Sequence, residues 1–380
     1  MKQFNPYRVL TVLCLAMIVA ACAAQPPVEH VVQHSRSELR SGHALGLESD
    51  QQISPTDTLA VNDDMRAFLA RHIPSNASDH QKVELILAAI LDEGLHLDYN
   101  NFKTFTAREA FEVREGNCLS FTNLFIALAR EAGLKANFQE VEVPANWTAR
   151  GDTYMYNLHI NALVNLPGKE QVIDFDMAAY NERYNRMLIP DESALAQYHN
   201  NMGVHWLNEG KVETAFRHMQ VALELRPDTG YFWTNLGTLY QHAGHDSEAE
   251  AAYLTAIEMS NEPTAMSNLS RLYTRIDQPE LANYYRARVE VFRSRNPYYL
   301  FNMAEEAYVQ SDYSRAKNLL LKAIRYRNDE VEFYRLLGLS YLQLGDKSAA
   351  QRQFMEAAEL AENPVERERY NHKLYLLANS

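Results

Sequence analysis

The stretch Gly237-Thr-Leu-Tyr240 marks a repeat that runs through the second half of the chain. Related stretches follow one another at intervals of about 34 residues, which is the period of a solenoid built from pairs of helices. In each unit a small residue recurs where the second helix would cross the first, and small residues let paired helices approach closely. The aligned stretches are Gly203-Val-His-Trp206, Gly237-Thr-Leu-Tyr240, Ser270-Arg-Leu-Tyr273, Ala304-Glu-Glu-Ala307 and Gly338-Leu-Ser-Tyr341, and the small residues are Ala215, Ala249, Ala282, Ala316 and Ala350.

These units resemble tetratricopeptide repeats, which predicts an all-α solenoid of five repeats over residues 195–364 and a capping helix over 365–380. The third unit is the most divergent, because Val289 stands where an alanine is usual. The resemblance implies that a protein or peptide binds in the concave groove, which the first helix of each pair lines. Aromatic residues at helical spacing can equally serve packing. By repeat register the groove candidates are Tyr231, Asn235, Tyr298, Phe301 and Arg335.

Residues 61–190 have a different pattern, in which helical and strand-like stretches alternate around Cys118. Gly116-Asn117 is a turn signal, and apolar residues then recur at helical spacing up to Gly133. Cys118 therefore begins an amphipathic helix, where unpaired N–H groups and the positive end of the helix dipole favour a thiolate. The cysteine is either a nucleophile or a small buried apolar residue.

A hairpin is predicted downstream of this helix. The stretch Tyr156 to Val164 alternates apolar and polar residues, which predicts a strand with His159 on the polar face. A turn at Asn165-Leu-Pro-Gly-Lys169 then leads to a returning strand that carries Asp174 and Asp176. His159 should therefore lie within hydrogen-bond reach of one of these aspartates, directly across or on the diagonal. The spacing leaves both aspartates open as its partner.

A cysteine at a helix start, a histidine on a strand and an aspartate on the next strand resemble the transglutaminase-like branch of the papain-type cysteine hydrolases. The resemblance covers roughly residues 80–180 and implies an α+β domain. It also implies that Cys118 is the nucleophile, His159 the general base and acid, and Asp174 the orienting carboxylate. The family often has His-x-Trp where this chain has His159-Ile-Asn161. For an oxyanion hole, the Cys118 N–H is one candidate donor and a residue near Tyr99 to Phe102 is another.

The N-terminus predicts export from the cytoplasm. Lys2 and Arg8 precede an apolar run over residues 9–21 that is too short to span a bilayer comfortably, which is typical of a signal peptide over residues 1–21. The run ends in Val19-Ala-Ala-Cys22, which resembles the lipobox of bacterial lipoproteins. The alternative is a plain secretory signal that is cut near Ala21 or Ala24.

The lipobox resemblance implies a lipid on Cys22 that anchors the chain in a membrane. Because Ala23 follows rather than aspartate, it also implies sorting to the outer membrane, with the protein facing the periplasm. Residues 22–60 lack apolar periodicity and are predicted to be a flexible tether.

Composition narrows the possible functions. The chain has three cysteines, of which Cys14 lies in the signal peptide and Cys22 carries the lipid, so Cys118 would be the only thiol of the mature protein. A formal net charge of -13 disfavours a nucleic-acid binder, which needs a basic face. No phosphate-binding glycine loop and no cluster of metal ligands at short spacing is visible, so we expect neither cofactor nor metal.

Two functions fit these patterns. The first is thiol-dependent acyl transfer on amide or peptide bonds, as a peptidase, deamidase or transglutaminase-like enzyme whose repeats recruit a protein. The second is a non-catalytic scaffold lipoprotein in which the thiol domain is degenerate and the repeats hold the partners.

Overall fold

The computed structural model describes residues 34–48, 53, 56–93, 95–141, 148–150, 153–155, 159–175, 186–361 and 364–378. The predicted signal peptide, the lipidation candidate Cys22 and the alternative aspartate Asp176 lie outside the described residues. Among the helices described, none has the length and apolar character needed to cross a bilayer.

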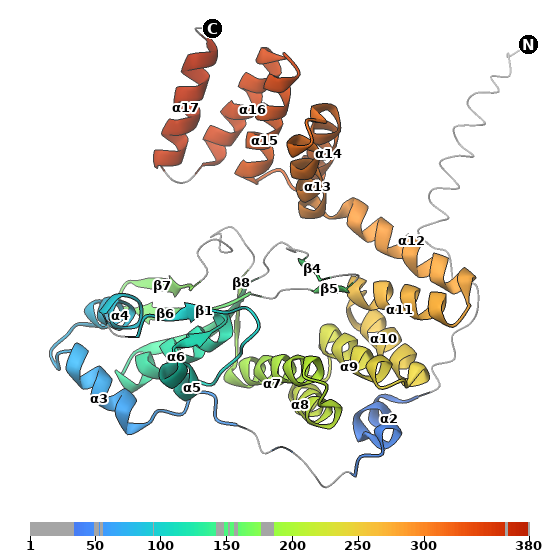
Figure 1. Cartoon of the computed structure of the whole chain (residues 1–380). Helices are drawn as coiled ribbons and strands as arrows, with labels where there is room; N and C mark the ends of the chain where they lie inside the picture. Colours follow the sequence, from blue (N-terminus) through green and yellow to red (C-terminus); the bar gives the residue numbers. More distant parts are fainter. Residues whose placement is uncertain are drawn as a thin grey trace, which may run out of the picture.

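The first folded region packs helices against a four-stranded antiparallel sheet of order β7-β6-β3-β8 (Figure 1). Its strands are β3 (Lys135–Val141), β6 (His159–Leu166), β7 (Lys169–Ile173) and β8 (Arg186–Ile189). The short strands β1 (Asp98–Tyr99) and β2 (Glu115–Gly116) pair in parallel, and β4 (Thr148–Arg150) pairs with β5 (Thr153–Met155). Its helices are α3 (Asp63–His72), α4 (Asp79–Ala88) with the π-turn η2 (Ala89–Glu93), α5 (Ala107–Val113) and α6 (Cys118–Glu131).

Helix α6 is the central helix of this region. Every residue from Leu119 to Ala129 is buried, so the helix is enclosed on all sides rather than amphipathic as the sequence predicted. Its apolar side chains share a core with Phe138 of β3 and Ile160 of β6. The helix begins where the Asn117 side chain accepts the Ser120 N–H, and Gly133 follows its end with φ of 85°.

The second region is a series of antiparallel helix pairs, as the 34-residue period predicted. Gly237 illustrates the close approach within a pair, because a Cβ added there would lie 2.7 Å from the Tyr253 ring of the next helix. The helices are α7 (Asp191–Asn208), α8 (Val212–Leu225), α9 (Gly230–His242), α10 (Asp246–Ser260), α11 (Pro263–Arg275), α12 (Pro279–Arg295), α13 (Pro297–Val309), α14 (Tyr313–Tyr326), α15 (Val331–Gln343), α16 (Lys347–Leu360) and α17 (Pro364–Ala378).

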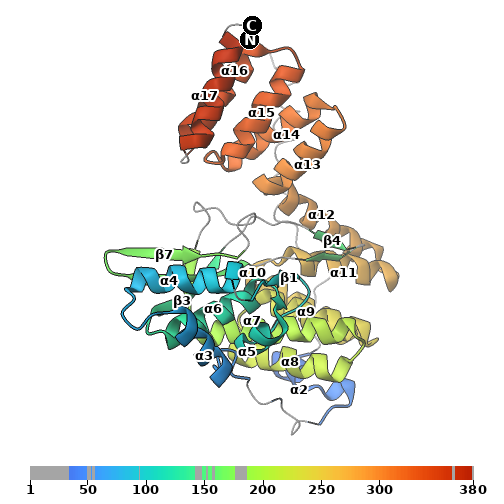
Figure 2. The ribbon, with the colours of Figure 1, turned by 60° about the vertical axis from the view of Figure 1, so that its left-hand side comes forward.

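The core of the solenoid is interrupted in the third unit. One continuous core extends from α7 to Val289 of α12, and separate cores begin at Leu300 of α13 and in the α15–α17 region. Helix α12 has 17 residues, against 15 in α10 and 14 in α14. Figures 1 and 2 both show α12 leading from one block of helices to the next. The divergence at Val289 therefore coincides with a real break in packing.

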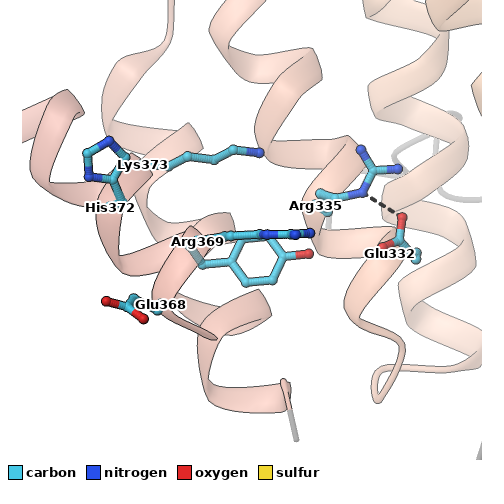
Figure 3. Close-up of a pocket in the computed structure, with 7 residues that line it drawn as sticks. Glu332, Arg335, Glu368, Arg369, His372 and Lys373 are labelled. Atoms are coloured by element: carbon cyan, nitrogen blue, oxygen red, sulfur yellow. Dashed lines mark hydrogen bonds and ion pairs between the residues drawn. The ribbon is translucent and has the colours of Figure 1, made fainter. Parts of the chain in front are cut away.

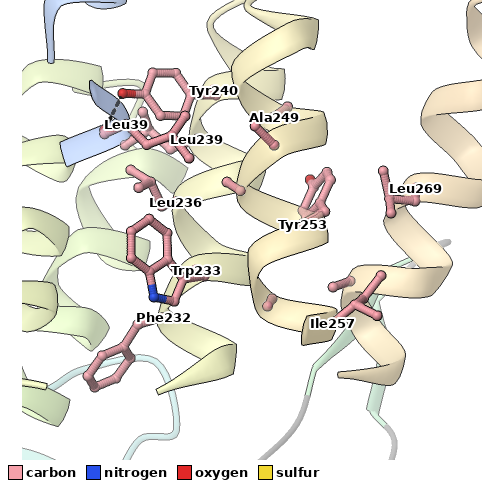
Figure 4. Packing of buried hydrophobic residues seen from close by; sticks show 14 of the residues in the cluster. Leu39, Phe232, Trp233, Leu236, Leu239, Tyr240, Ala249, Tyr253, Ile257 and Leu269 are labelled. Atoms are coloured by element: carbon pink, nitrogen blue, oxygen red, sulfur yellow. Dashed lines mark hydrogen bonds between the residues drawn. The ribbon is translucent and has the colours of Figure 1, made fainter. Parts of the chain in front are cut away.

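For residues 34–48 the structure contradicts the predicted flexible tether. Helix α2 (Arg36–Ser41) and the short 3-10 turn η1 (His43–Leu45) pack against the repeats, and Leu39 is buried in their core. The Tyr240 hydroxyl donates to the Leu39 carbonyl at 2.5 Å, as Figure 4 shows. Gln220 donates to the Arg40 carbonyl at 3.0 Å. The aromatic residues that hold this segment come from distant repeats, which explains why its own sequence gives no sign of order.

Candidate active site

A tight turn fixes Cys118 at the start of α6. Gly116 is required in this turn, because a Cβ there would lie 2.5 Å from the Cβ of Ser120. The Asn117 side chain donates to Thr104 at 2.8 Å and accepts from the Ser120 N–H at 3.1 Å, so it joins the incoming loop to the helix. Cys118 is the first helical residue and is partly exposed. Its N–H has no acceptor within the helix, and the helix dipole favours negative charge at its sulfur.

His159 is the first residue of β6 and contacts Asp174, the residue after β7. Its Nε2 lies 2.7 Å from Asp174 Oδ2, and the two side chains are only 6% and 2% exposed. The strand register pairs Ala162 with Ile173, which continues to Asn161 opposite Asp174 and leaves His159 on the diagonal. Of the two aspartates left open by the sequence, Asp174 makes this contact.

The helix and the strand that carry the thiol and the imidazole are tied together. Thr122, one turn beyond Cys118, donates to the carbonyl of Ile160 at 3.3 Å, next to His159. Cys118 is near enough to His159 for the sulfur to raise the pKa of the ring. Because Nε2 of the ring faces Asp174, the nitrogen that remains for the sulfur is Nδ1.

The charge on His159 is set by competing effects. Burial disfavours the protonated ring, but the hydrogen bond to Asp174, the hydrogen bond to Cys118 and the charges of both outweigh burial and raise the pKa of His159 to about 10. At neutral pH the ring is therefore an imidazolium. An imidazolium beside a sulfur at a helix N-terminus stabilises the thiolate, which is the nucleophilic form of cysteine.

Asn161 completes the group, and sequence reasoning did not assign it a role. Its Nδ2 donates to Asp174 Oδ2 at 2.9 Å, so one carboxylate oxygen accepts from both Asn161 and His159. The side chain is fully buried, and its Oδ1 has no hydrogen-bond partner among the residues that the structure describes. The sequence feature that could have pointed to Asn161 is its position two residues after His159, which puts both side chains on one face of the strand.

An aromatic cluster adjoins the thiol. Phe121, on the turn of α6 that follows Cys118, meets the rings of Tyr99 and Phe175 with centroids 6.1 Å and 5.8 Å apart. Tyr99 is 42% exposed, and Phe102 further along the same loop is 61% exposed. Within this loop Asn100 donates to Glu115 at 2.7 Å and accepts from the Phe102 N–H at 3.0 Å. These bonds hold the loop in place, and both the Cys118 N–H and a residue of this loop stay candidates for the oxyanion donor.

Four of the five predicted groove residues serve packing or internal hydrogen bonds. Tyr231 packs against the repeat core, and Asn235 donates to Asn200 at 2.8 Å. Phe301 stacks on the Phe333 ring at 5.1 Å, and the Tyr298 hydroxyl donates to Glu330. Arg335 differs from these four, because it lines a cavity.

No cluster of three or more metal-ligating side chains occurs among the described residues. The candidate site combines a thiol, an imidazole and a carboxylate supported by an amide, an arrangement suited to nucleophilic attack on an acyl carbon.

Several solved structures are similar to this chain at low identity. MamA from Desulfovibrio magneticus RS-1 is 16% identical, with 45% of this chain and 96% of that chain covered and a TM-score of 0.25. PilF of Pseudomonas aeruginosa is 14% identical, with 50% and 86% covered and a TM-score of 0.27. YrrB, whose structure is titled a TPR protein with an unusual peptide-binding site, is 15% identical, with 47% and 92% covered and a TM-score of 0.24. No curated protein matches the chain.

Family models match both regions. The model of the transglutaminase-like superfamily matches residues 67–215, and models of the tetratricopeptide repeat match residues 231–263 and 301–367. The chain therefore has a transglutaminase-like domain followed by a helical region of tetratricopeptide repeats, as the sequence predicted. The repeats support a role in protein–protein interaction.

Proposed function

We propose that this chain is a thiol-dependent acyl-transfer enzyme that acts on amide or peptide bonds of proteins recruited by its repeats. The observation that carries the proposal is the buried His159–Asp174 contact at 2.7 Å, with Cys118 near enough to the same imidazole to raise its pKa. The transglutaminase-like family match over residues 67–215 supports the same chemistry.

In this mechanism the Cys118 thiolate attacks the amide carbonyl carbon, and the carbonyl oxygen becomes an oxyanion that the Cys118 N–H can stabilise. The tetrahedral intermediate collapses with cleavage of the C–N bond, and the His159 imidazolium gives its proton to the leaving amine. A thioester and a neutral imidazole remain. Water or a second amine then attacks the thioester, its proton passes to His159, and the thiolate leaves as the acid or new amide forms. Asp174 holds the ring in one tautomer throughout.

The proposed location is the outer membrane, with the enzyme anchored through a lipid on Cys22 and facing the periplasm. The apolar run over residues 9–21 and the Val19-Ala-Ala-Cys22 stretch support this proposal. Incorporation of radioactive palmitate into the wild-type chain, and its loss in Cys22→Ser, tests the anchor. Palmitate retained by Cys22→Ser would contradict it.

The decisive test of the enzyme is the reactivity of Cys118. We expect iodoacetamide to alkylate Cys118 in the native chain faster than it alkylates free cysteine at pH 6 to 7, because the His159 imidazolium and the start of α6 stabilise negative charge on the sulfur as it attacks. Mass spectrometry of the Cys118 peptide separates this reaction from any at Cys14 or Cys22. His159→Ala should slow the alkylation, while His242→Ala, a change of an exposed histidine in the repeats, should not.

A rate no faster than that of free cysteine would leave the scaffold as the function. A cellular complementation assay separates the two directly, since Cys118→Ala abolishes the function of an enzyme and spares that of a scaffold.

A further inference from the structure

Among the second helices of the repeat pairs, α14 differs from the others in charge. Between Tyr313 and Tyr326 it has four basic residues and no acidic residue, whereas α10 has four acidic residues and no basic one. Helices α8, α12 and α16 each contain charges of both signs. The chain as a whole has a net charge of -13, so α14 is a local concentration of positive charge in an acidic protein.

The cations of α14 lie on its outward face. Arg315, Lys322 and Arg325 are exposed, and their spacing of seven and then three residues keeps them on one side of the helix. The opposite side packs into the core that α14 shares with α13 and α15. Figures 1 and 2 both show α14 in the C-terminal block of helices, away from the transglutaminase-like domain. The cations are therefore accessible to a partner outside the chain.

These three cations have no counter-ion within the part of the chain that the structure describes. Their side chains form neither an ion pair nor a hydrogen bond there. By contrast, Arg335 on the neighbouring helix α15 forms an ion pair with Glu332, as Figure 3 shows. The positive potential of the outward face of α14 is thus left for an external anion to neutralise.

Two apolar side chains flank the cations. Leu321 is 39% exposed, and Tyr326 is 49% exposed. Basic residues beside leucine and an aromatic ring are typical of peripheral helices that contact the headgroup region of a bilayer. The inner side of α14 is fixed in the repeat core, so the helix cannot turn that side toward hydrocarbon. Contact between this face and a bilayer would therefore be superficial and chiefly electrostatic.

We propose that the outward face of α14 binds the surface of an anionic phospholipid bilayer, with Arg315, Lys322 and Arg325 contacting lipid phosphates and Leu321 and Tyr326 entering the headgroup region. The cations extend over ten residues, or about 15 Å at 1.5 Å per residue, which spreads their charge over several lipids. The proposed lipid anchor supports a membrane partner, because it would keep a bilayer close to the chain. The site functions without Cys118, so it goes beyond the proposed enzyme and does not depend on it.

The test measures acetylation of Lys322 by a water-soluble succinimidyl ester in the full-length chain reconstituted into vesicles. Mass spectrometry of the Lys322 peptide at low conversion gives the rate. We expect a rate about tenfold lower in vesicles that contain phosphatidylglycerol than in vesicles of phosphatidylcholine alone, since each cation near an anionic surface favours the contact about fivefold, or about 1 kcal/mol. Salt at about 1 M should remove this protection, because the Debye length falls to about 3 Å. Lys169, exposed on β7, should react equally in both vesicles.

Arg315→Ala combined with Arg325→Ala should weaken the surface contact about 25-fold, which corresponds to two cations, and Lys322 should then react at similar rates in both vesicles. The matched control combines Arg71→Ala with Arg108→Ala. It removes the same charge from exposed positions of the transglutaminase-like domain and should leave the protection of Lys322 unchanged. Thermal melting verifies that both variants are folded.

Three results would overturn the proposal. Equal rates at Lys322 in the two kinds of vesicle would mean that α14 does not touch the lipid. Equal slowing at Lys322 and Lys169 would mean that the whole chain adsorbs without using this face. Soluble polyglutamate added to phosphatidylcholine vesicles represents the alternative partner, an acidic protein. If it protects Lys322 as strongly as phosphatidylglycerol does, the face binds polyanions in general and the membrane proposal fails.

Discussion

Each ring nitrogen of His159 has its own partner, and these two partners determine the charge of the ring. Nε2 faces a carboxylate that is almost fully buried, and the remaining nitrogen faces the sulfur of Cys118. A carboxylate in this position fixes the tautomer of a neutral imidazole and stabilises the imidazolium when it forms. The proposed chemistry needs both effects, because the same ring must give a proton to the leaving amine and later take one from water.

Replacing Asp174 with Asn should lower the pKa of His159 from about 10, because the hydrogen bond to Asp174 is the largest effect that raises it. The imidazolium then loses its proton at a lower pH than in the wild type, and the thiolate loses its charged partner. We expect the alkaline limb of the alkylation rate, measured from pH 6 to 11, to move to lower pH. Glu170→Gln is the matched control, since Glu170 is an exposed carboxylate on β7. An unchanged pH profile in Asp174→Asn would rule out the orienting role.

Asn161 should act as a positioning residue through Asp174. Asn161→Ala removes the second donor to Asp174 Oδ2, so the carboxylate gains freedom to turn away from His159. We expect alkylation of Cys118 at neutral pH to slow about tenfold, since a charge-assisted hydrogen bond contributes about 1.5–3 kcal/mol. Asn165→Ala, two positions further along the same strand face where the side chain is exposed, should leave the rate unchanged. A purely structural role for Asn161 would lower the melting temperature and leave the pH profile of alkylation in place.

The sequence was sufficient to suggest Cys118 and His159, because helix starts and strand alternation place functional groups at predictable positions, whereas the choice of Asp174 over Asp176 came from the family resemblance. It could not suggest Asn161. The role of this residue depends on the register Ala162↔Ile173, which the turn between β6 and β7 sets, and an asparagine on a strand has no distinctive pattern of its own. The same register explains why His159 meets Asp174 on the diagonal.

At the scale of elements, α7 and α8 bury a pair of histidines that makes the fold sensitive to acid. Nδ1 of His199 and Nδ1 of His218 lie 3.0 Å apart, and both residues are buried. One ring must donate and the other accept, so the accepting ring must be neutral and the contact is lost when both rings are protonated. Burial lowers the pKa of each histidine to about 4, and for His199 the neighbouring His218 adds to the effect.

The stability that these histidines contribute should be present above pH 6.5, their unfolded value, and decline as the pH falls toward about 4. The loss is on the order of 3 kcal/mol per histidine as an upper limit, at 1.36 kcal/mol per pH unit. Thermal melts at pH 7 and pH 5 measure the part of this loss that is reached by pH 5, about 2 kcal/mol per histidine. The variant with His199→Gln and His218→Gln should show a smaller drop than the wild type, and His242→Gln, at an exposed position on α9, should show the full drop. An equal drop in all three proteins would place the acid sensitivity elsewhere.

The helices of the repeats were more predictable than their surroundings. A period of about 34 residues predicts helix pairs from many positions at once, so a single divergent residue changes the prediction little. Helix α2 was missed for the opposite reason. Its order depends on Leu39 entering a core formed by Phe216 and Tyr240, and the hydrogen bond from Tyr240 spans 201 residues of sequence. Contacts of such range leave no local pattern.

At the scale of the whole molecule, α7 belongs to both folded regions. Ala194 and Tyr198 pack into the core of the transglutaminase-like domain, while Ala196 and Leu207 pack into the core of the first repeats. The ion pair between Arg130 and Asp191, with contacts of 2.6 Å and 2.9 Å, joins α6 to the start of this helix. The sequence predicted a domain boundary between residues 190 and 195, because composition changes there. In the structure, instead, the domain and the repeats up to α12 share helix α7, whose residues belong to both cores.

This arrangement predicts how the chain should unfold. Since α7 couples the domain to the first repeats, and the core is interrupted between α12 and α13, calorimetry should resolve two transitions that divide the chain between α12 and α13 rather than near residues 190–195. Tyr198→Ala should lower the first transition and leave the second in place. Phe354→Ala, in the core of α15 to α17, should do the reverse. Each change removes a buried aromatic side chain worth about 3–5 kcal/mol, or a shift on the order of 10 °C.

The two variants serve as controls for each other, because they remove similar side chains from different cores. A Tyr198→Ala variant in which the two transitions shift together would mean that α12 transmits stability across the break. A first transition that splits into separate domain and repeat steps would mean that α7 does not couple them. Only independent shifts agree with the division of the cores. That result would also mean that the core of α15 to α17 can unfold without disturbing Cys118 and His159.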